Sequence, residues 1–326
     1  MGIPRRLCSS LNLFQVVRFG SKKKSYSSLH PPNPSCSNSF LTHGIHVFQC
    51  PDTVGIVAKL SDCIASRGGN ILAADVFVPQ NKRVFYSRNV FVFDPVVWPR
   101  MQMEEDFLRL SKTFNAMRSV IRVPALDPKY KIAIVASKQD HCLIDLLHGW
   151  QDGRLSVDIT CVISNHFRGP ESEVIRFLEM HGVPYHYLRP TENKSEPEIL
   201  KLVQNTDFLV LARYTRILSS TFLRSYGKDI INIHHGLLPS FSGINPSKQA
   251  VDAGVKLIGA TSHFVTEEHN AGPIIEQMVE RVCHRDNLQS FVQKSQNLEK
   301  QCLSSAIRSY CELRVLPYEE KKTVVF

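Results

Sequence analysis

The beginning of this 326-residue sequence lacks acidic residues. No Asp or Glu precedes Asp52, whereas residues 1–41 contain six basic residues and nine serines. An acid-free segment rich in Arg and Ser is typical of organellar import peptides. We therefore expect residues 1–41 to be a transit peptide to the mitochondrion, with the chloroplast as the alternative destination. A basic, disordered tail with no import role would have the same composition.

Outside that segment, the sequence lacks an excess of charge of either sign. The formal net charge is +9, but without the six basic residues of the leader the chain has 33 basic residues and 30 acidic ones. A body this close to neutral does not have the charge of a typical nucleic-acid-binding protein. The sequence also lacks an apolar run of about 18 residues, the length that a membrane helix needs. We therefore expect neither a nucleic acid nor a membrane as partner.

Paired cysteines are absent as well. The nine cysteines include no Cys-x-x-Cys pair and no group with histidine at the spacing of a metal site. An odd, scattered set of cysteines is typical of reduced thiols packed in the interior. The cysteine pattern therefore predicts no bound metal, and we expect no cofactor either.

Apolar spacing over residues 42–125 predicts strands and helices in the order βαββαβ. Ile56, Leu60 and Ile64 fall on one face of the first helix. The second helix is expected over residues 102–117, with an apolar face made of Phe107, Leu110, Phe114 and Met117. The expected strands are residues 44–50, 71–78, 84–93 and 120–123. This order predicts a ferredoxin-like domain.

The pattern changes after a linker at residues 126–131. From residue 132 to residue 326, short apolar runs alternate with helical stretches, which is how strands buried on both faces read. The runs are KIAIVAS, VDITCVIS, PYHYL, DFLVLAR and DIINIH. Strands alternating with helices predict a doubly wound, mostly parallel, Rossmann-like α/β domain. Ligands of such sheets bind beyond the carboxyl ends of the strands.

One predicted strand ends in several polar side chains, in INIHHGLLP. Because side chains alternate along a strand, Asn232 and His234 share one side and His235 lies on the other. An amide donor beside an imidazole can hold and protonate a developing oxyanion. A polar strand end that only binds its own loop is the alternative interpretation, and the spacing alone does not separate the two.

The first domain resembles the ACT family of regulatory modules, in CPDTVGIVAKLSDCIASRGGNI at residues 50–71. The resemblance implies an amino-acid effector bound at a dimer interface, and therefore a homo-oligomer. A module that only joins subunits and binds nothing is the other reading of the same resemblance.

The second domain resembles the folate-dependent formyl-transfer family, in NIHHGLLPSF and GATSHFVTEEHNAGPIIEQ. The resemblance implies that Asn232 donates to the formyl oxygen and that His234 supplies a proton or positive charge to it. The family's Asp-x-Gly-Pro turn begins with Asn270 here, which therefore takes the place of a catalytic carboxylate. The implied substrate-binding residues are Arg213, Tyr214, Arg216, Ile217 and Leu218 of RYTRIL, Gly243 of the adjoining loop, and the supporting His263.

Two features that the sequence lacks indicate which member of that family it resembles. The member that formylates a ribonucleotide has a glycine-rich phosphate loop after its first strand, whereas SKQDHCL here contains no glycine. The member that formylates methionyl-tRNA would need a further carboxyl-terminal domain, for which too few residues follow GPII. The sequence thus resembles formyltetrahydrofolate deformylase, which implies 10-formyltetrahydrofolate as substrate and water as the formyl acceptor.

The sequence departs from the family at Asn270. A carboxylate beside an imidazole raises the histidine's pKa and can relay a proton, and a neutral amide can do neither. Nearby Glu267 and Glu268 would need a particular geometry to replace it, and His269 is interpreted as a solvated loop residue. Three hypotheses follow: a working deformylase, a catalytically impaired paralogue that binds folate, and a formyltransferase with another acceptor.

Overall fold

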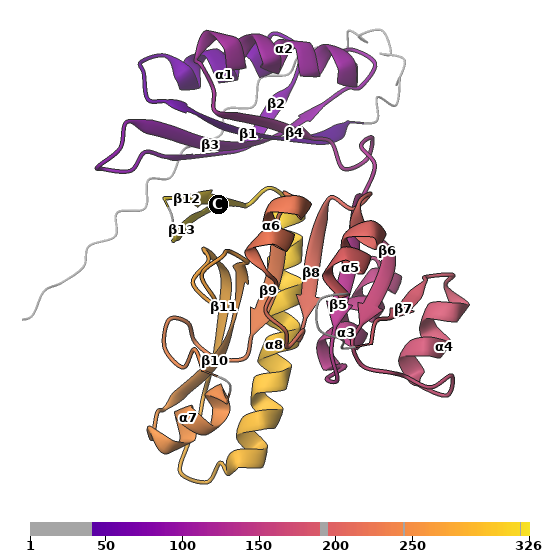
Figure 1. The fold of residues 1–326 in the computed structure, drawn as a ribbon. Coiled ribbons are helices and arrows are strands. Elements are labelled where there is room, and N and C mark those ends of the chain that lie inside the picture. The colour runs from indigo at the N-terminus through magenta and orange to yellow at the C-terminus, as the bar shows by residue number, and fades with distance from the viewer. Residues whose placement is uncertain (1–40, 190–194, 244, 320) are drawn as a thin grey trace, which may run out of the picture. The chain divides into compact units, whose positions relative to one another are not determined.

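The computed structural model describes residues 41–189, 195–243, 245–319 and 321–326 (Figure 1). All but the last residue of the expected transit peptide, 1–41, lie outside the described residues. Within the described part of the chain, no helix is both long enough and apolar enough to span a membrane.

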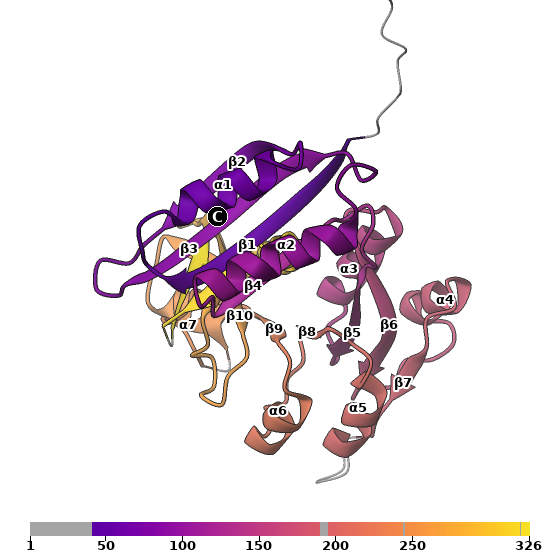
Figure 2. The same cartoon turned by 90° about the horizontal axis from the view of Figure 1, so that it is seen from above.

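The first part of the described chain forms a four-stranded antiparallel sheet. Its strands have the order β2-β3-β1-β4, and both helices cover one face of the sheet (Figures 1 and 2). The elements are β1 (Thr42–Pro51), α1 (Ile56–Ala65), β2 (Asn70–Phe77), β3 (Val84–Phe93), α2 (Arg100–Thr113) and β4 (Arg118–Arg122). The βαββαβ order predicted from the sequence is confirmed.

The apolar faces of the two helices were predicted with unequal success. In α1, Ile56, Leu60 and Ile64 are all buried, as predicted. Helix α2 ends four residues earlier than predicted, so Met117 lies beyond it and is exposed. The cause is Asn115, whose φ of 49° is left-handed and which ends the helix with a bond from the Ala116 N–H to the Ser111 carbonyl.

A seven-stranded sheet forms the second part, in the order β11-β10-β9-β8-β5-β6-β7. Strands β5 to β9 are parallel, and β10 and β11 are antiparallel additions at one edge. The strands are β5 (Tyr130–Ala136), β6 (Val157–Ser164), β7 (Tyr185–Tyr187), β8 (Phe208–Ala212), β9 (Ile230–His234), β10 (Leu257–Phe264) and β11 (Ile274–Arg281). The mostly parallel α/β sheet predicted from the five apolar runs is confirmed.

Helices cover both faces of this sheet, as its alternating side chains require. In β9, Ile231 and Ile233 join the core beside α8, whereas Ile230 joins the core on the opposite face. The helices are α3 (His141–Gln151), α4 (Glu173–Met180), α5 (Ser195–Val203), α6 (Ser220–Tyr226), α7 (Pro246–Asp252) and α8 (Leu288–Cys311). The alternation therefore places Asn232 and His234 on the same side of β9, as predicted.

The chain ends in a small hairpin that contacts the first sheet. The hairpin consists of β12 (Val315–Tyr318) and β13 (Lys322–Val325). Its apolar side chains form one core with Ile45, Val47 and Tyr86. Nearby, the buried Arg88 guanidinium donates to the Glu312 carbonyl at 3.1 and 3.2 Å. The face of the first sheet that lacks helices is thus packed against the end of the chain.

Candidate active site

The carboxyl end of β9 lies between two neighbours that bring polar groups to it. Strand β8 runs parallel to β9, so both end at the same edge of the sheet. Strand β10 runs antiparallel and places His263 beside Asn232 and Thr261 beside His234. The GATSHF and NIH motifs, about 30 residues apart in sequence, thus meet at one edge.

The amide of Asn232 is oriented by His263. The Nδ2 of Asn232 lies 3.2 Å from Nε2 of His263, and Nδ1 of His263 lies 2.9 Å from the Phe264 carbonyl oxygen. Burial lowers the pKa of His263 to about 4, so the ring is neutral near pH 7. A carbonyl can only accept, so Nδ1 holds the ring proton and Nε2 accepts from Asn232. Among the described residues, the second Nδ2 hydrogen of the half-buried Asn232 has no partner, so it can donate to a ligand oxygen.

His234 is also held in its neutral form. Its side chain is largely buried, and burial is the main cause that lowers its pKa. The bond to the Phe241 carbonyl raises the pKa, and the charges of Arg213 and His269 lower it. Because Nε2 donates to that carbonyl at 3.0 Å, the neutral ring carries its lone pair on Nδ1. This arrangement makes Nδ1 of His234 a proton acceptor.

Asn270 connects two loops beside the strand end. It adopts a left-handed φ of 55°, and its Nδ2 donates to the Ser242 carbonyl at 3.1 Å. Exposed Gly243 follows Ser242, and a Cβ built there would lie 2.3 Å from Nε2 of Gln249. That atom is the end of a flexible, exposed side chain, so Gln249 can move aside for a larger residue at position 243. His269 is exposed, as expected of a solvated loop histidine.

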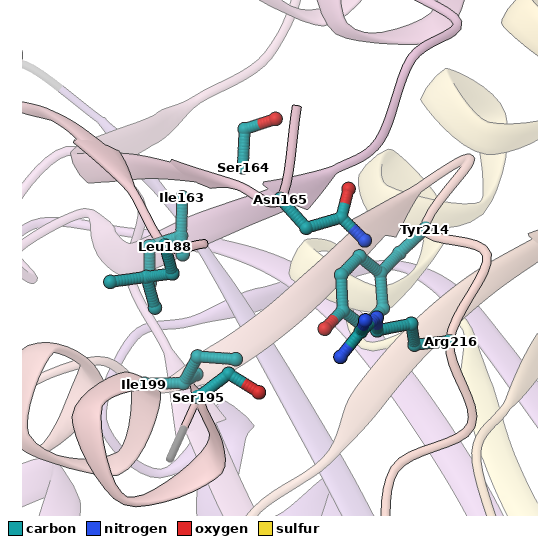
Figure 3. A pocket seen from close by; sticks show the side chains of 8 residues that line it. All are labelled: Ile163, Ser164, Asn165, Leu188, Ser195, Ile199, Tyr214 and Arg216. Carbon is teal, nitrogen blue, oxygen red and sulfur yellow. The ribbon is translucent and has the colours of Figure 1, made fainter. Parts of the chain in front are cut away.

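The predicted substrate-binding segment RYTRIL does not form one surface. Tyr214 and Arg216 lie together and line a pocket that also contains Asn165 and Ser195 (Figure 3). The remaining lining residues are Ile163, Ser164, Leu188 and Ile199. Ile217 is instead exposed, and Leu218 packs into the core with Phe222.

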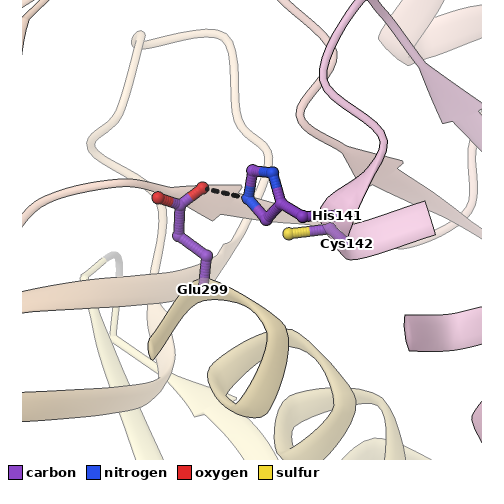
Figure 4. Close-up of side chains that lie close together, drawn as sticks. All are labelled: His141, Cys142 and Glu299. Carbon is purple, nitrogen blue, oxygen red and sulfur yellow. Dashed lines mark hydrogen bonds and ion pairs between the residues drawn. The ribbon is translucent and has the colours of Figure 1, made fainter. Parts of the chain in front are cut away.

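The fifth member of that segment, Arg213, belongs to a buried network that the sequence did not predict. Its Nε lies 3.1 Å from Oε2 of Glu299, and another guanidinium nitrogen contacts Nδ1 of His235. Glu299 also accepts from His141 at 2.9 Å, as Figure 4 shows, and from Ser295 at 2.9 Å. Burial alone would raise the pKa of Glu299, but the bond from His141 and the Arg213 charge lower it below its ordinary value. The carboxylate is therefore ionised and fully paired.

The signal for this network was a charged residue on an apolar helix face. Glu299 occupies the same buried face of α8 as Ser295 and Leu303. A carboxylate in such a position is almost never buried without a partner. The sequence therefore required a partner for Glu299, although it did not identify which cation would supply it.

In the described part of the chain, one group of side chains is close enough together to hold a metal ion. The chemistry of these side chains does not favour metal binding. The ligand atoms of His141, Cys142 and Glu299 lie within 4.8 Å of one another. Burial raises the pKa of Cys142 well above its ordinary value, so the thiol keeps its proton, whereas a metal needs the thiolate. The Glu299 carboxylate is already neutralised by Arg213. The pair of His141 and Glu299 is therefore assigned a structural role, with the buried Cys142 thiol packed beside it.

The chain is similar to known proteins over almost all its length. Residues 130–307 match the formyl transferase family model. The chain is 70% identical to formyltetrahydrofolate deformylase 2, mitochondrial, of Arabidopsis thaliana, across 98% of this chain and 97% of that protein.

Solved structures of a deformylase and of a transformylase both match, and the deformylase matches over more of the chain. A formyltetrahydrofolate deformylase of Pseudomonas syringae pv. tomato matches with a TM-score of 0.78 and 39% identity, over 89% of this chain and 96% of that one. Glycinamide ribonucleotide transformylase 1 of Symbiobacterium toebii matches with a TM-score of 0.55 and 27% identity, over 61% of this chain and 94% of that one. The resemblance drawn from the sequence motifs is confirmed: the chain belongs to the formyltetrahydrofolate deformylases, within the formyl transferase family.

Proposed function

We propose that this protein hydrolyses 10-formyltetrahydrofolate to formate and tetrahydrofolate. The observation that carries the proposal is the pair at the end of β9, where Asn232 has a free amide hydrogen and His234 has a free lone pair on the same side of the strand. Carbonyl hydrolysis needs one donor for the oxyanion and one base for water. Membership of the deformylases, with 70% identity to one of them, supports the same substrate.

The proposed reaction follows from these two side chains. The formyl oxygen accepts a hydrogen bond from Nδ2 of Asn232. Nδ1 of His234 takes a proton from water as the water oxygen bonds to the formyl carbon. The resulting imidazolium stabilises the adjacent oxyanion and then gives its proton to the folate nitrogen, whose bond to carbon breaks. Formate and tetrahydrofolate leave, and the reaction needs neither metal nor cofactor.

Asn270 is compatible with this scheme because the base is neutral His234. A carboxylate would strengthen the base, but the lone pair on Nδ1 is present without one. The impaired folate-binding paralogue and the transfer to another acceptor therefore gain no support from the site. For the folate itself, we propose Tyr214, Arg216 and Gly243 as contacts, and His263 as the residue that orients Asn232.

We further propose the organisation of the remaining chain. Residues 42–125 are an ACT-like regulatory domain with an amino-acid effector in a homo-oligomer, a proposal that the βαββαβ topology supports. Residues 126–131 link it to the catalytic domain, residues 132–326. Residues 1–41 direct the protein to the mitochondrion, as the name of the Arabidopsis relative suggests.

Formate release from 10-formyltetrahydrofolate tests the catalytic proposal. His234→Ala should lower kcat by about 10²- to 10⁴-fold, because both base and charge are lost. The exposed His284→Ala is a matched control and should retain full activity. Formate release from His234→Ala within threefold of the unmodified protein would refute the mechanism. Stoichiometric formylation of added glycinamide ribonucleotide would refute the assignment to hydrolysis.

A further inference from the structure

The first turn of the parallel sheet lies where such sheets bind their ligands. Residues 137–140 join β5 to α3, and β5 pairs with β8 on one side and β6 on the other. The chain runs outward from β5 through β6 to β7 and then returns to β8, so the strand order reverses between β5 and β8. Doubly wound sheets bind ligands beyond the carboxyl ends of the strands at this reversal.

Side chains of the protein itself bridge this position. Oγ of Ser137 lies 3.1 Å from Oγ1 of Thr215 and accepts from the Thr215 N–H at 3.1 Å. Oε1 of Gln139 accepts from Nε of Arg213 at 2.9 Å. Arg213 also contacts His235, the residue after the proposed base. The turn after β5 is thus connected by hydrogen bonds to the ends of β8 and β9.

Arg168 fills the other side of the turn. Its side chain is 3% exposed and donates to the Ser137 carbonyl at 2.6 Å, to Oγ of Ser164 at 2.6 Å and to the Tyr185 hydroxyl at 3.0 Å. Its Nε donates to Oδ1 of Asp140 at 3.1 Å, and a second nitrogen contacts the same carboxylate. A guanidinium is the side chain best suited to hold a phosphate or carboxylate. Here that capacity is used by Asp140.

We propose that Asp140 occupies the anion-binding capacity of Arg168 and thereby reserves the formyl group for water. An acceptor that carries an anionic group finds the buried guanidinium of Arg168 already paired and meets the charge of Asp140. Of the residues of this turn, the exposed Lys138 is the cation left to attract it. Water needs no anion-binding site, so its access to the formyl carbon is unaffected. The inference rests on the proposed hydrolysis and identifies Asp140 and Arg168 as residues that determine the choice of acceptor.

Replacing Asp140 tests the proposal by a gain of binding. Asp140→Asn and Asp140→Ala should bind inorganic phosphate at least tenfold more tightly than the unmodified full-length protein, measured by isothermal titration calorimetry. Asp152→Asn is the matched control, because it removes an exposed carboxylate from the far end of α3. It should bind phosphate no better than the unmodified protein. Asp140→Ala combined with Arg168→Leu should lose the gain.

The possible outcomes separate this proposal from the assignment of the enzyme. Phosphate binding to both Asp140 variants no tighter than to Asp152→Asn would overturn the proposal, as would equal binding by the unmodified protein. Asp140→Asn keeps the shape of the side chain, so it provides the test if Asp140→Ala does not fold. Because phosphate binding is measured without turnover, a failure to release formate would refute the hydrolase and leave this result interpretable.

Discussion

The ends of β9 and β5 lie at the same edge of one sheet. Polar groups keep unused hydrogen-bonding capacity at the end of β9, whereas those at the end of β5 are paired with one another. At β9, Asn232 keeps one amide hydrogen and His234 keeps one lone pair. At the turn after β5, Ser137, Gln139 and Asp140 are each bonded to another side chain of the protein. Groups that are left unsatisfied are available for substrate, whereas groups that satisfy one another give rigidity.

The unpaired groups at the end of β9 serve catalysis, whereas the paired groups after β5 exclude other ligands. An unsatisfied donor in a partly buried position has a cost in stability, so it is retained where a ligand completes it. A fully paired cluster is costly to open, and the pairing itself keeps other ligands out. The edge of the sheet thus holds a reactive position and a closed position about two strands apart.

Removing the open donor at β9 should have a large effect on the rate, second to that of removing His234. Asn232→Ala removes the hydrogen bond to the oxyanion and should lower kcat by about 10²- to 10³-fold, with KM changed much less. Steady-state formate release measures both constants. Asn205→Ala, on an exposed loop, is the control and should behave as the unmodified protein. A kcat that stays within threefold would show that the amide does not face the oxyanion.

Breaking the buried network around Glu299 should lower the stability of the protein more than its catalytic rate. Glu299→Gln leaves Arg213 without its buried counter-charge and should lower the free energy of unfolding by about 3 kcal/mol. Glu312→Gln is matched, because it removes an exposed partner of Arg314 just beyond the same helix and should cost at most about 1 kcal/mol. Urea unfolding followed by circular dichroism measures both. Equal losses would mean that the buried pair has no special role.

Much of the fold could be predicted because burial leaves a local pattern in the sequence. Strands β5, β6, β8 and β9 lie inside the sheet and are covered on both faces, so they read as apolar runs. The end of α2 could not be predicted in this way, since it depends on the left-handed backbone of Asn115 and not on apolar spacing. The hairpin strand β12 was missed because its run contains Pro317 and is only four residues long.

The candidate site was predictable where its residues are neighbours on a strand, and less so elsewhere. The shared side of Asn232 and His234 follows from strand alternation alone. The bond between His141 and Glu299 spans 158 residues, and no local pattern encodes that distance. RYTRIL reads as one segment, yet Arg213 turns toward Glu299 while Leu218 enters the core, because the loop after β8 follows no regular alternation.

The smallest expected effect concerns the charge beside the open end of β9. The charge of His269 lowers the pKa of His234, so residue 270 is expected to influence the same ring. Asn270→Asp would add a negative charge there, raise the pKa of His234 and strengthen it as a base, increasing kcat about tenfold.

The pH dependence distinguishes this effect from a change in structure. The neutral ring is the active form, so kcat/KM should be level near pH 7 and fall only as the pH drops below the ordinary histidine value of 6.5, since the pKa of His234 is lowered. In Asn270→Asp the fall should begin at a higher pH. Asn270→Ala removes the bond to Ser242 without adding charge and should leave the position of the acid limb unchanged. If the acid limbs of all three proteins coincide between pH 5 and 8, the missing carboxylate has no electrostatic effect on the base, and the open end of β9 works through Asn232 and His234 alone.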